Sequence, residues 1–550
     1  MTAGGAASAS GAAVVPLAEA MIATLKSSGV RFLFGVPGGG SSLDLIAAAD
    51  DAGMQFMLCR GETAAALAAS VAGQLSGAPG VVLTAIGPGA ASAVNGFAYA
   101  HLERAALLLI CDSREAGQHI PPHQEFDLQA LFRPIAKACV CLEAESGAAQ
   151  FADLVALARR PPEGPILVEL AAGEARRSVA VAAANGAAIE SGERHADASP
   201  EGARDKAGAL LARSRRPILL IGLQAISSDI GAALLRLAER LGCPVMTSYK
   251  AKGVVADSHR QMLGHLTGAD GEAAAIRRAD LIIWAGVEPV ELIAAPWRHD
   301  AALLALSDRA GLEYPQAPAL ELIGPLAPAL EALTASCRRS EWQQDEISGL
   351  REAVKERLRL AGGEGHTAES VVDAVTAAAG DDVRFTVDAG AHMISIMARI
   401  QAPQAHRVLK STGLSTMGFA VPAAIASALV EPERRIVAFT GDGGLMMCLA
   451  ELSTAARLGC RLTVIVLNDA ALSLIDLKQQ RRQHRPVGVR YPAVDFAAAA
   501  AGLGCRAWKI GLQEPLQPAL TAALAHDGAS LIDVAVDPSG YGDQLAALRG

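Results

Sequence analysis

Two aspartates stand where their carboxylates could bind one metal ion. Asp442 and Asp469 lie 27 residues apart, shortly after the apolar runs RIVAFT and LTVIVLN, with a helical stretch between the runs. In a parallel strand-helix-strand unit the two strands are neighbours, so groups just past their carboxyl ends converge on one crevice. Hard cations such as Mg²⁺ prefer carboxylate oxygens. The spacing therefore predicts a metal site at the start of the intervening helix.

Glycines surround the first of these aspartates. Gly441, Gly443 and Gly444 let backbone N–H groups approach phosphate oxygens, and the helix N-terminus adds partial positive charge. An ordinary strand-helix turn with an acidic N-cap is the simpler alternative, because G-x-G turns are common. A dinucleotide-binding turn would have a third glycine where Met446 stands, and it would leave the second carboxylate unexplained. We therefore favour a site for a metal ion and a diphosphate.

The segment GDGGLMMCLAELSTAARLGCRLTVIVLND resembles the GDG…N motif of thiamine-diphosphate-dependent enzymes, specifically the acetolactate synthase-like superfamily. The resemblance covers almost the whole chain. It implies that Asp442 and Asp469, with the backbone carbonyl of Ala471, hold Mg²⁺, and that Mg²⁺ binds the diphosphate. Ser473 and Leu474 are implied at the cofactor. Many relatives have Asn where this chain has Asp469, which bears on metal preference because a second carboxylate adds charge and removes an amide donor.

A second motif of the family lies in the N-terminal part of the chain. CRGETAAALAAS resembles the segment whose glutamate, here Glu62, contacts the cofactor's aminopyrimidine ring. A carboxyl group hydrogen-bonded to the ring nitrogen favours the imino tautomer, whose nitrogen can remove the proton of the thiazolium carbon. Apolar neighbours raise a carboxyl pKa toward proton sharing. From this segment alone a solvated glutamate at a helix start is the simpler interpretation, and only the other motifs reverse that preference.

Two glycine-rich loops and a glutamine complete the predicted N-terminal site. FGVPGGGSS and IGPGAAS are expected to wall the cofactor, with Gly38, Gly39 and Gly40 allowing close approach, although plain turn chemistry explains glycines equally well. HQEFDLQALFRPIAK resembles the segment whose glutamine, here Gln124, faces the active site. His123 is a second candidate, though a lone histidine is more often structural.

Two further loops of the C-terminal part match the family. STGLSTMGFAVPAAIASA resembles the loop that bends the cofactor, which implies Met417 beneath it and the Ser415 carbonyl and Met417 amide on the aminopyrimidine. A core methionine is the alternative for Met417. VDAGAHMIS resembles a diphosphate-contacting loop and implicates Gly390, Ala391 and His392. Relatives often have glutamine where Ala391 stands, so one side-chain contact is missing.

The fold class follows from length and from the alternation of strand and helix patterns. The chain has 550 residues, of which 51% are hydrophobic, enough for several cores. We expect an α/β protein, and the resemblance implies three consecutive Rossmann-like parallel-sheet domains. These are a pyrimidine-binding domain (12–175), a linker (176–203), a central α/β domain (204–337), a polar helical connector (338–365) and a diphosphate- and Mg-binding domain (366–540).

Charge and cysteine usage limit the partners and the compartment. A net charge of −9 without a basic stripe argues against nucleic acid. The nine cysteines include no C-x-x-C pair, so we interpret them as small buried hydrophobes in a reducing, cytoplasmic compartment. The N-terminal MTAGGAASASGAAVVPLAEA lacks a basic start and a continuous apolar stretch, and we expect a flexible tail there. No apolar run approaches the length that spans a bilayer, so we expect no membrane partner.

The resemblance is strongest to acetolactate synthases, which implies a 2-oxo acid decarboxylase and carboligase. Lys478 replaces a substrate-selecting tryptophan of biosynthetic relatives, and Ala106 replaces a proline, so the acceptor stays open. The alternative is a decarboxylase or lyase without carboligation that acts on another 2-oxo acid or an acyl-CoA. A catalytically silent subunit is disfavoured by Glu62. A flavin-dependent oxidase is disfavoured too, because IGLQA lacks the consecutive glycines of FAD-containing relatives.

Two expectations concern the surface. The basic segment LKQQRRQHRPVGVR could attract an anionic substrate, but a solvated or interfacial helix is the simpler interpretation. The family builds its site from two domains of different subunits, so the resemblance implies a homodimer or homotetramer with active sites at the subunit interface.

Overall fold

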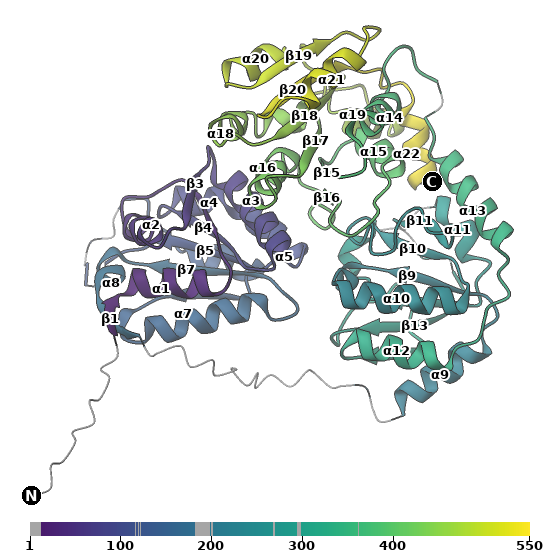
Figure 1. Cartoon of the computed structure of the whole chain (residues 1–550), viewed down its shortest axis with the longest axis horizontal. Coiled ribbons are helices and arrows are strands. Elements are labelled where there is room, and N and C mark those ends of the chain that lie inside the picture. The colour runs from purple at the N-terminus through teal and green to yellow at the C-terminus, as the bar shows by residue number, and fades with distance from the viewer. Residues whose placement is uncertain are drawn as a thin grey trace, which may run out of the picture. The chain divides into compact units, whose positions relative to one another are not determined.

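The computed structural model describes residues 13–115, 117–118, 120, 123–181, 199, 202–267, 270–293, 297, 299–360 and 362–549. These residues form three six-stranded sheets and one two-stranded sheet, within two compact units, Met1–Glu193 and Arg194–Gly550 (Figure 1). Within each six-stranded sheet all neighbouring strands are parallel, which confirms the predicted α/β class with three parallel-sheet domains. Most of the predicted N-terminal tail lies outside the described residues.

The first unit is built on a sheet whose two central strands, β4 and β5, are buried along their whole length, as continuous apolar runs predict. Its strands are β2 (Phe32–Gly35), β3 (Gln55–Leu58), β4 (Gly80–Thr84), β5 (Leu107–Asp112), β6 (Ala138–Cys141) and β7 (Pro165–Leu170). Its helices are α1 (Leu17–Ser27), α2 (Ser41–Asp51), α3 (Glu62–Ser76), α4 (Pro88–Ser92), α5 (Val94–Leu102), α6 (Leu128–Phe132), η1 (Arg133–Ile135), α7 (Ala144–Arg159) and α8 (Ala172–Arg176). The strand order is β3-β2-β4-β5-β7-β6, so the chain leaves β2 toward one edge and returns on its other side at β4.

A short antiparallel ribbon closes this unit. β1 (Ala13–Pro16) pairs with β8 (Ser178–Val181). The segment predicted as a linker, 176–203, therefore contains a strand, and its first and last residues belong to α8 and to the helix Ala203–Arg213. Of the rest, residues 182–198 lie outside the described part of the chain.

The central sheet belongs to the second unit. Its strands are β9 (Pro217–Ile221), β10 (Val245–Ser248), β11 (Met262–Leu266), β12 (Leu281–Ala285), β13 (Ala302–Ser307) and β14 (Leu320–Ile323). Its helices are α9 (Ala203–Arg213), η2 (Leu223–Ala225), α10 (Ser228–Leu241), α11 (Asp270–Ile276), η3 (Pro289–Glu291) and α12 (Leu326–Ser336), and the connector contains α13 (Gln344–Arg357). The order β11-β10-β9-β12-β13-β14 places the reversal of direction between β9 and β12.

The third sheet repeats the topology of the first. Its strands are β15 (Val383–Val387), β16 (Val408–Lys410), β17 (Arg435–Gly441), β18 (Leu462–Asn468), β19 (Arg506–Ile510) and β20 (Ser530–Ala535). Its helices are α14 (Ala368–Ala379), α15 (His392–Arg399), α16 (Ala420–Val430), α17 (Asp442–Met446), α18 (Glu451–Arg457), α19 (Ser473–Arg481), α20 (Phe496–Gly502), α21 (Gln517–Leu524) and α22 (Tyr541–Arg549). In the order β16-β15-β17-β18-β20-β19, β16 lies on one side of β15 and β17 on the other. The outer two domains thus share one fold without a visible sequence repeat.

The prediction that the cysteines are buried holds for seven of the nine and is wrong for Cys141, which is exposed, while Cys139 is half-buried. Both lie on β6, which is an edge strand of its sheet. An edge strand lacks a neighbour on one side, so the same apolar alternation leaves more surface open there.

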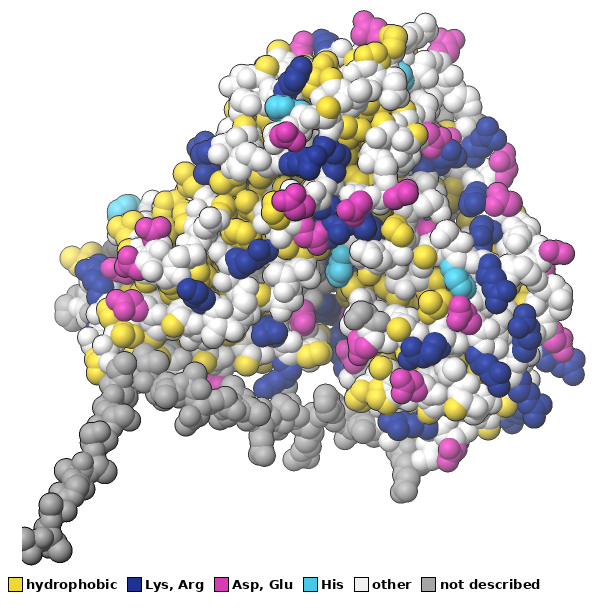
Figure 2. All heavy atoms as spheres, in the orientation of Figure 1, with side chains coloured by type: hydrophobic (Ala, Val, Ile, Leu, Met, Phe, Trp, Pro, Cys, Tyr) yellow, Lys and Arg dark blue, Asp and Glu magenta, His cyan; other side chains and the backbone are white. Residues whose placement is uncertain are grey.

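The surface carries charges of both signs. On the face shown in Figure 2, acidic and basic side chains are interspersed rather than gathered by sign. In the described part of the chain, no helix is both long and apolar enough to cross a bilayer.

Candidate active site

The predicted metal ligands follow β17 and β18, next to the point between β15 and β17 where the third sheet reverses direction and where such sheets bind ligands. β17 pairs with β15 on one side and with β18 on the other, with Gly441 opposite Leu467 in register. The loops after β15, β17 and β18 therefore open at the same edge. They contain Gly390, Asp442 and Asp469 respectively.

The two carboxylates are close enough to interact. Asp442 is only 3% exposed, and its Oδ1 accepts a hydrogen bond of 2.8 Å from the Gly443 amide. Its Oδ2 is buried and makes no well-aligned hydrogen bond with the described residues. Burial raises the pKa of Asp442. Burial and the neighbouring charge of Asp442 raise the pKa of Asp469 to about 6. A cation bound between the two carboxylates would stabilise the charged form of each.

The loop that follows Asp469 is fastened by the segment 489–491. The Leu472 amide donates to the Val489 carbonyl at 2.7 Å, and the Tyr491 amide donates to the Ala470 carbonyl at 3.2 Å. Ala470 has a φ of +56°, a conformation that is energetically unfavourable for a residue other than glycine. The two hydrogen bonds hold the backbone in this conformation and thereby stabilise the loop.

Each of the remaining predicted residues of this loop has a definite contact. The Ser473 hydroxyl donates to Asp469 Oδ2 at 2.6 Å, and half-buried Leu474 packs against the core of the domain. Ala471 forms an isolated bridge with Arg490. In the part of the chain that the structure describes, no group of three or more His, Cys, Asp or Glu side chains could hold a metal ion. A metal here would take two carboxylates and a backbone carbonyl.

His392 lies between the two glycine turns of the site. A Cβ atom on Gly390 would be 2.4 Å from His392 Cε1, and one on Gly441 would be 2.9 Å from the same atom. The imidazole is 7% exposed, and its Nε2 has no hydrogen-bond partner among the described residues. Burial lowers its pKa to about 4, so the ring is neutral at physiological pH. Ala391, next to it, is buried.

The loop 411–419 reaches the same glycine turn. Met417 Cε lies 3.4 Å from the position that a Cβ on Gly443 would take. Ser415 is exposed and has a φ of +52°, and its hydroxyl donates to the Thr412 carbonyl at 3.1 Å. The structure thus brings Met417 to the turn that carries Asp442, whereas the Ser415 side chain contacts its own loop.

Sequence reasoning missed the residue that fastens this loop to the sheet. Asp388, fully buried after β15, accepts hydrogen bonds from the amides of Gly418, Phe419 and Ala420 at 3.2, 2.7 and 3.1 Å. It also accepts a hydrogen bond of 2.7 Å from the Thr440 hydroxyl at the end of β17. An acid directly after the apolar strand RFTV was the available signal.

An equivalent acid fastens the glycine loop of the first unit, and it too was missed. Asp112 Oδ1 accepts from the Ser42 amide at 2.9 Å, and its Oδ2 accepts from the Gly40 amide at 3.0 Å. A Cβ on Gly38 would lie 2.1 Å from Asp112 Oδ2, whereas one on Gly39 would meet open space. The loop therefore needs glycine at 38 for packing, and Gly39 stays available for an approaching ligand.

Glu62 begins α3 and lies against the loop that follows β4. Its Oε1 is 3.3 Å from the position of a Cβ on Gly89. Burial raises its pKa. Gln124 is exposed with a φ of +76°, and its carbonyl oxygen would be 2.0 Å from a Cβ on Gly87. His123 is exposed as well. The loops of Glu62 and Gln124 thus meet the same glycine-rich turn.

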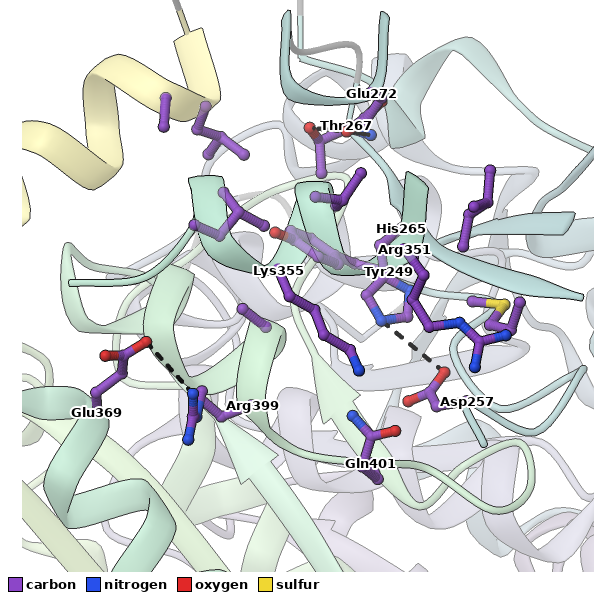
Figure 3. A pocket seen from close by; sticks show the side chains of 18 of the residues that line it. Tyr249, Asp257, His265, Thr267, Glu272, Arg351, Lys355, Glu369, Arg399 and Gln401 are labelled. Carbon is purple, nitrogen blue, oxygen red and sulfur yellow. Dashed lines mark hydrogen bonds and ion pairs between the residues drawn. The ribbon is translucent and has the colours of Figure 1, made fainter. Parts of the chain in front are cut away.

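A cavity of about 400 Å³ lies elsewhere in the second unit, between β11, α13 and the helices α14, α15 and α22. Figure 3 shows Lys355, Gln401, Asp257 and His265 pointing toward one another in it. None of the predicted site residues lines it.

The charged walls of this cavity are paired within the protein. Arg399 Nη1 lies 3.8 Å from Glu369 Oε1. Asp257 holds the buried Lys252 at 2.6 Å, and its Oδ1 lies 3.9 Å from His265 Nε2. These charged groups are thus neutralised by neighbouring groups of the protein.

Three segments of the chain match one enzyme family in order. Residues 16–131 match the N-terminal TPP binding domain of thiamine pyrophosphate enzymes, 204–333 the central domain and 388–534 the C-terminal TPP binding domain. The chain belongs to the thiamine pyrophosphate enzyme family. This confirms the resemblance drawn from the motifs, thiamine pyrophosphate being another name for thiamine diphosphate.

Relatives of this thiamine pyrophosphate enzyme align over nearly their full length. The catabolic acetolactate synthase of Raoultella terrigena is 29% identical over 539 residues, covering 94% of this chain and 95% of the relative. An acetolactate synthase of Bacillus subtilis is 26% identical over 555 residues, covering 96% and 94%. The acetolactate synthase isozyme 1 large subunit of Escherichia coli is 27% identical over 537 residues, covering 94% of each. The protein is an acetolactate synthase-like enzyme that depends on thiamine pyrophosphate.

The residues present fit a metal-bound diphosphate. His392 Nε2 and Asp442 Oδ2 are buried polar atoms that make no well-aligned hydrogen bond with the described residues, although the Tyr491 hydroxyl is near enough to Asp442 to lower the pKa of that carboxyl. Cβ atoms on Gly390, Gly441 and Gly443 would each lie within 3 Å of a neighbouring side chain, so glycine keeps the backbone amides of the turns accessible. Both features suit an anion bound through a cation.

Proposed function

We propose that this protein is a Mg²⁺-dependent 2-oxo acid decarboxylase and carboligase of the acetolactate synthase type. It would use thiamine diphosphate to decarboxylate a 2-oxo acid and transfer the acyl fragment to a second carbonyl compound. The observation that carries the proposal is the pair of interacting carboxylates, buried Asp442 and half-buried Asp469, at the ends of the neighbouring strands β17 and β18. The full-length similarity to acetolactate synthases supports the reaction class.

In this proposal Asp442, Asp469 and the Ala471 carbonyl hold Mg²⁺. Gly390, Ala391, His392, Gly441, Gly443 and Gly444 surround the diphosphate, together with Ser473 and Leu474. The neutral imidazole of His392 adds no charge to the site and can donate the hydrogen bond of its protonated ring nitrogen to a phosphate oxygen. Its orientation is fixed because it packs between Gly390 and Gly441.

The other part of the proposed site surrounds the aminopyrimidine and the reacting carbon of the cofactor. The first unit contributes Glu62, Gly38, Gly39 and Gln124, and Ser415 and Met417 contact the aminopyrimidine. Thiamine diphosphate, when bound, supplies a thiazolium carbon that adds to a carbonyl group and then accepts its electrons. Glu62 would hold a proton at the aminopyrimidine nitrogen, and its raised pKa supports this role because a larger fraction of the carboxyl then carries the proton. Met417, whose thioether faces Gly443, would support the ring from below.

A second subunit is needed because, in the family, the N-terminal and C-terminal motifs that bind one cofactor come from different subunits. We propose a homodimer, or a homotetramer of such dimers, in which Glu62 of one subunit and the carboxylate pair of another serve the same cofactor. Sedimentation velocity of the purified protein is expected to give at least a dimer. A monomer at concentrations where the enzyme turns over would contradict this.

The reaction is tested by supplying a panel of 2-oxo acids and acyl-CoA compounds with thiamine diphosphate and Mg²⁺. Carbon dioxide release and carboligation products are followed together. A 2-hydroxy-2-alkyl-3-oxo acid formed from two 2-oxo acids supports the synthase. If the enzyme releases only carbon dioxide and an aldehyde, or turns over only an acyl-CoA, the decarboxylase or lyase alternative replaces the synthase. That alternative is tested because half-buried Lys478 stands where the resemblance places the tryptophan of biosynthetic relatives.

A further inference from the structure

The strand order of the central sheet predicts a second position for a phosphate-bearing ligand. Its strands run in the order β11-β10-β9-β12-β13-β14, and the direction of the chain reverses between β9 and β12. In sheets of this order the diphosphate of a dinucleotide binds just beyond the carboxyl ends of these two strands. The residues there are Gly222 and Leu223 after β9, and Gly286 to Glu288 after β12.

A side chain of the protein already fills this crevice. Glu291 is 7% exposed, and its Oε2 accepts hydrogen bonds from the Leu223 amide at 2.9 Å and the Glu288 amide at 2.8 Å. Its Oε1 accepts a short hydrogen bond from the Ser248 hydroxyl at the end of β10. One carboxylate thus binds groups at the ends of three strands, in the manner in which backbone amides bind a phosphate.

The turn itself is closed around this carboxylate. A Cβ on Gly222 would lie 2.5 Å from Glu291 Oε2 and 2.2 Å from the Val287 Cα. Gly222 therefore lets two backbone segments and the Glu291 carboxyl group pack together, and no space for a ligand is left between them.

The next pair of strand ends is closed in the same way. Gln224 Oε1 accepts hydrogen bonds from the Asp308 amide at 3.0 Å and the Ser307 hydroxyl at 3.3 Å, beyond β13. Beside it, Glu288 pairs with Arg309 at 2.5 Å. Donors that could receive the rest of a nucleotide are used by the protein's own acceptors.

We propose that the carboxyl group of Glu291 occupies the diphosphate position of the central domain. The unmodified domain therefore takes neither FAD nor another dinucleotide, and removal of this one carboxyl group opens an anion site at the ends of β9 and β12. The residues do not fit a flavin dinucleotide, in agreement with the absence of consecutive glycines in IGLQA. This inference holds whichever 2-oxo acid the enzyme uses.

The test compares the full-length wild type with Glu291→Ala and with Glu291→Gln. The glutamine keeps the size and an acceptor oxygen for the amides of Leu223 and Glu288, so it is the matched control. Inorganic pyrophosphate is titrated into each protein by calorimetry with EDTA present, so that a metal-dependent site elsewhere makes the same contribution to all three. We expect Glu291→Ala to bind one additional equivalent at least tenfold more tightly than the other two proteins.

A destabilised variant still gives an answer. Pyrophosphate that binds the opened site stabilises the folded state, so it should raise the melting temperature of Glu291→Ala more than that of the wild type or Glu291→Gln. If Glu291→Ala does not fold, Glu291→Ser takes its place. Equal isotherms and equal melting shifts for all three proteins would overturn the proposal.

The flavin gives an independent readout. After incubation with FAD and gel filtration, the wild type and Glu291→Gln are expected to elute without flavin absorbance. Stoichiometric flavin retained by the wild type would show that the crevice opens despite Glu291, and would overturn the proposal.

Discussion

Asp388 at the end of one strand accepts a 2.7 Å hydrogen bond from Thr440 at the end of the neighbouring strand. The same carboxylate accepts from three amides of the 418–420 turn. The loop that carries Met417 is thereby tied to the strand that leads into Asp442. The metal turn and the loop predicted to lie beneath the cofactor are therefore positioned by one buried acid.

Replacing Asp388 by alanine should weaken both folding and cofactor binding. The change leaves several buried amides without an acceptor, and we expect the free energy of unfolding to fall by about 3 kcal/mol. Urea denaturation followed by circular dichroism measures this. Asp381→Ala, at an exposed acid of the same domain, should change it by less than about 0.5 kcal/mol. Equal losses for the two variants would contradict the role of Asp388.

Replacing Glu62 by glutamine should preserve the fold and the metal site while slowing proton loss from the cofactor. Glutamine keeps the shape of the side chain and cannot share a carboxyl proton, so exchange at the thiazolium carbon should slow by roughly 100-fold or more. Hydrogen-deuterium exchange of enzyme-bound thiamine diphosphate, quenched and measured by NMR, provides the rate. Glu19→Gln, at an exposed position of α1, is the control. Exchange at the wild-type rate in Glu62→Gln would rule out the assigned role.

Glu291 should make stability depend on pH. Burial, opposed by its three hydrogen bonds and reinforced by the charge of Glu288, raises its pKa from 4.5 to about 7; Glu288 itself is paired with Arg309. The folded state therefore holds a proton that the unfolded state has lost, and the stability gained at low pH disappears as the pH rises from 4.5 to about 7.

Glu291→Gln has no such proton to lose. The free energy of unfolding of the wild type, relative to this variant, should thus be lower at about pH 8 than at about pH 5. Urea titrations of both proteins at the two pH values measure the difference. Parallel profiles would mean that Glu291 ionises as freely in the folded protein as in the unfolded one.

The sequence predicted the parts of this protein that depend on local pattern. Continuous apolar runs ending in glycine turns located the strands after which Asp442, Asp469 and Glu62 stand, because strand ends and helix starts are marked in the chain itself. The pairing of β1 with β8 was missed, since SVAV is four residues long and its partner lies at the other end of the domain.

Buried acids were the other omission. Asp112, Asp388 and Glu291 act on amides of distant loops, and nothing in their immediate sequence names those partners. Cys141 was misjudged for a related reason, because edge position is set by strand order. In each case the deciding contact is made by tertiary structure.

The central claim is that Asp442 and Asp469 hold the metal that binds thiamine diphosphate. Calorimetric titration of thiamine diphosphate into the wild type and Asp442→Ala, with and without Mg²⁺, tests it most directly, with the exposed Asp527→Ala as the control. Loss of a group that only orients a metal ligand weakens binding by about tenfold to 100-fold, so loss of a ligand should cost at least that. We expect tight, Mg²⁺-dependent binding by the wild type and Asp527→Ala and none that responds to Mg²⁺ in Asp442→Ala. Unchanged Mg²⁺-dependent binding in Asp442→Ala would contradict the account.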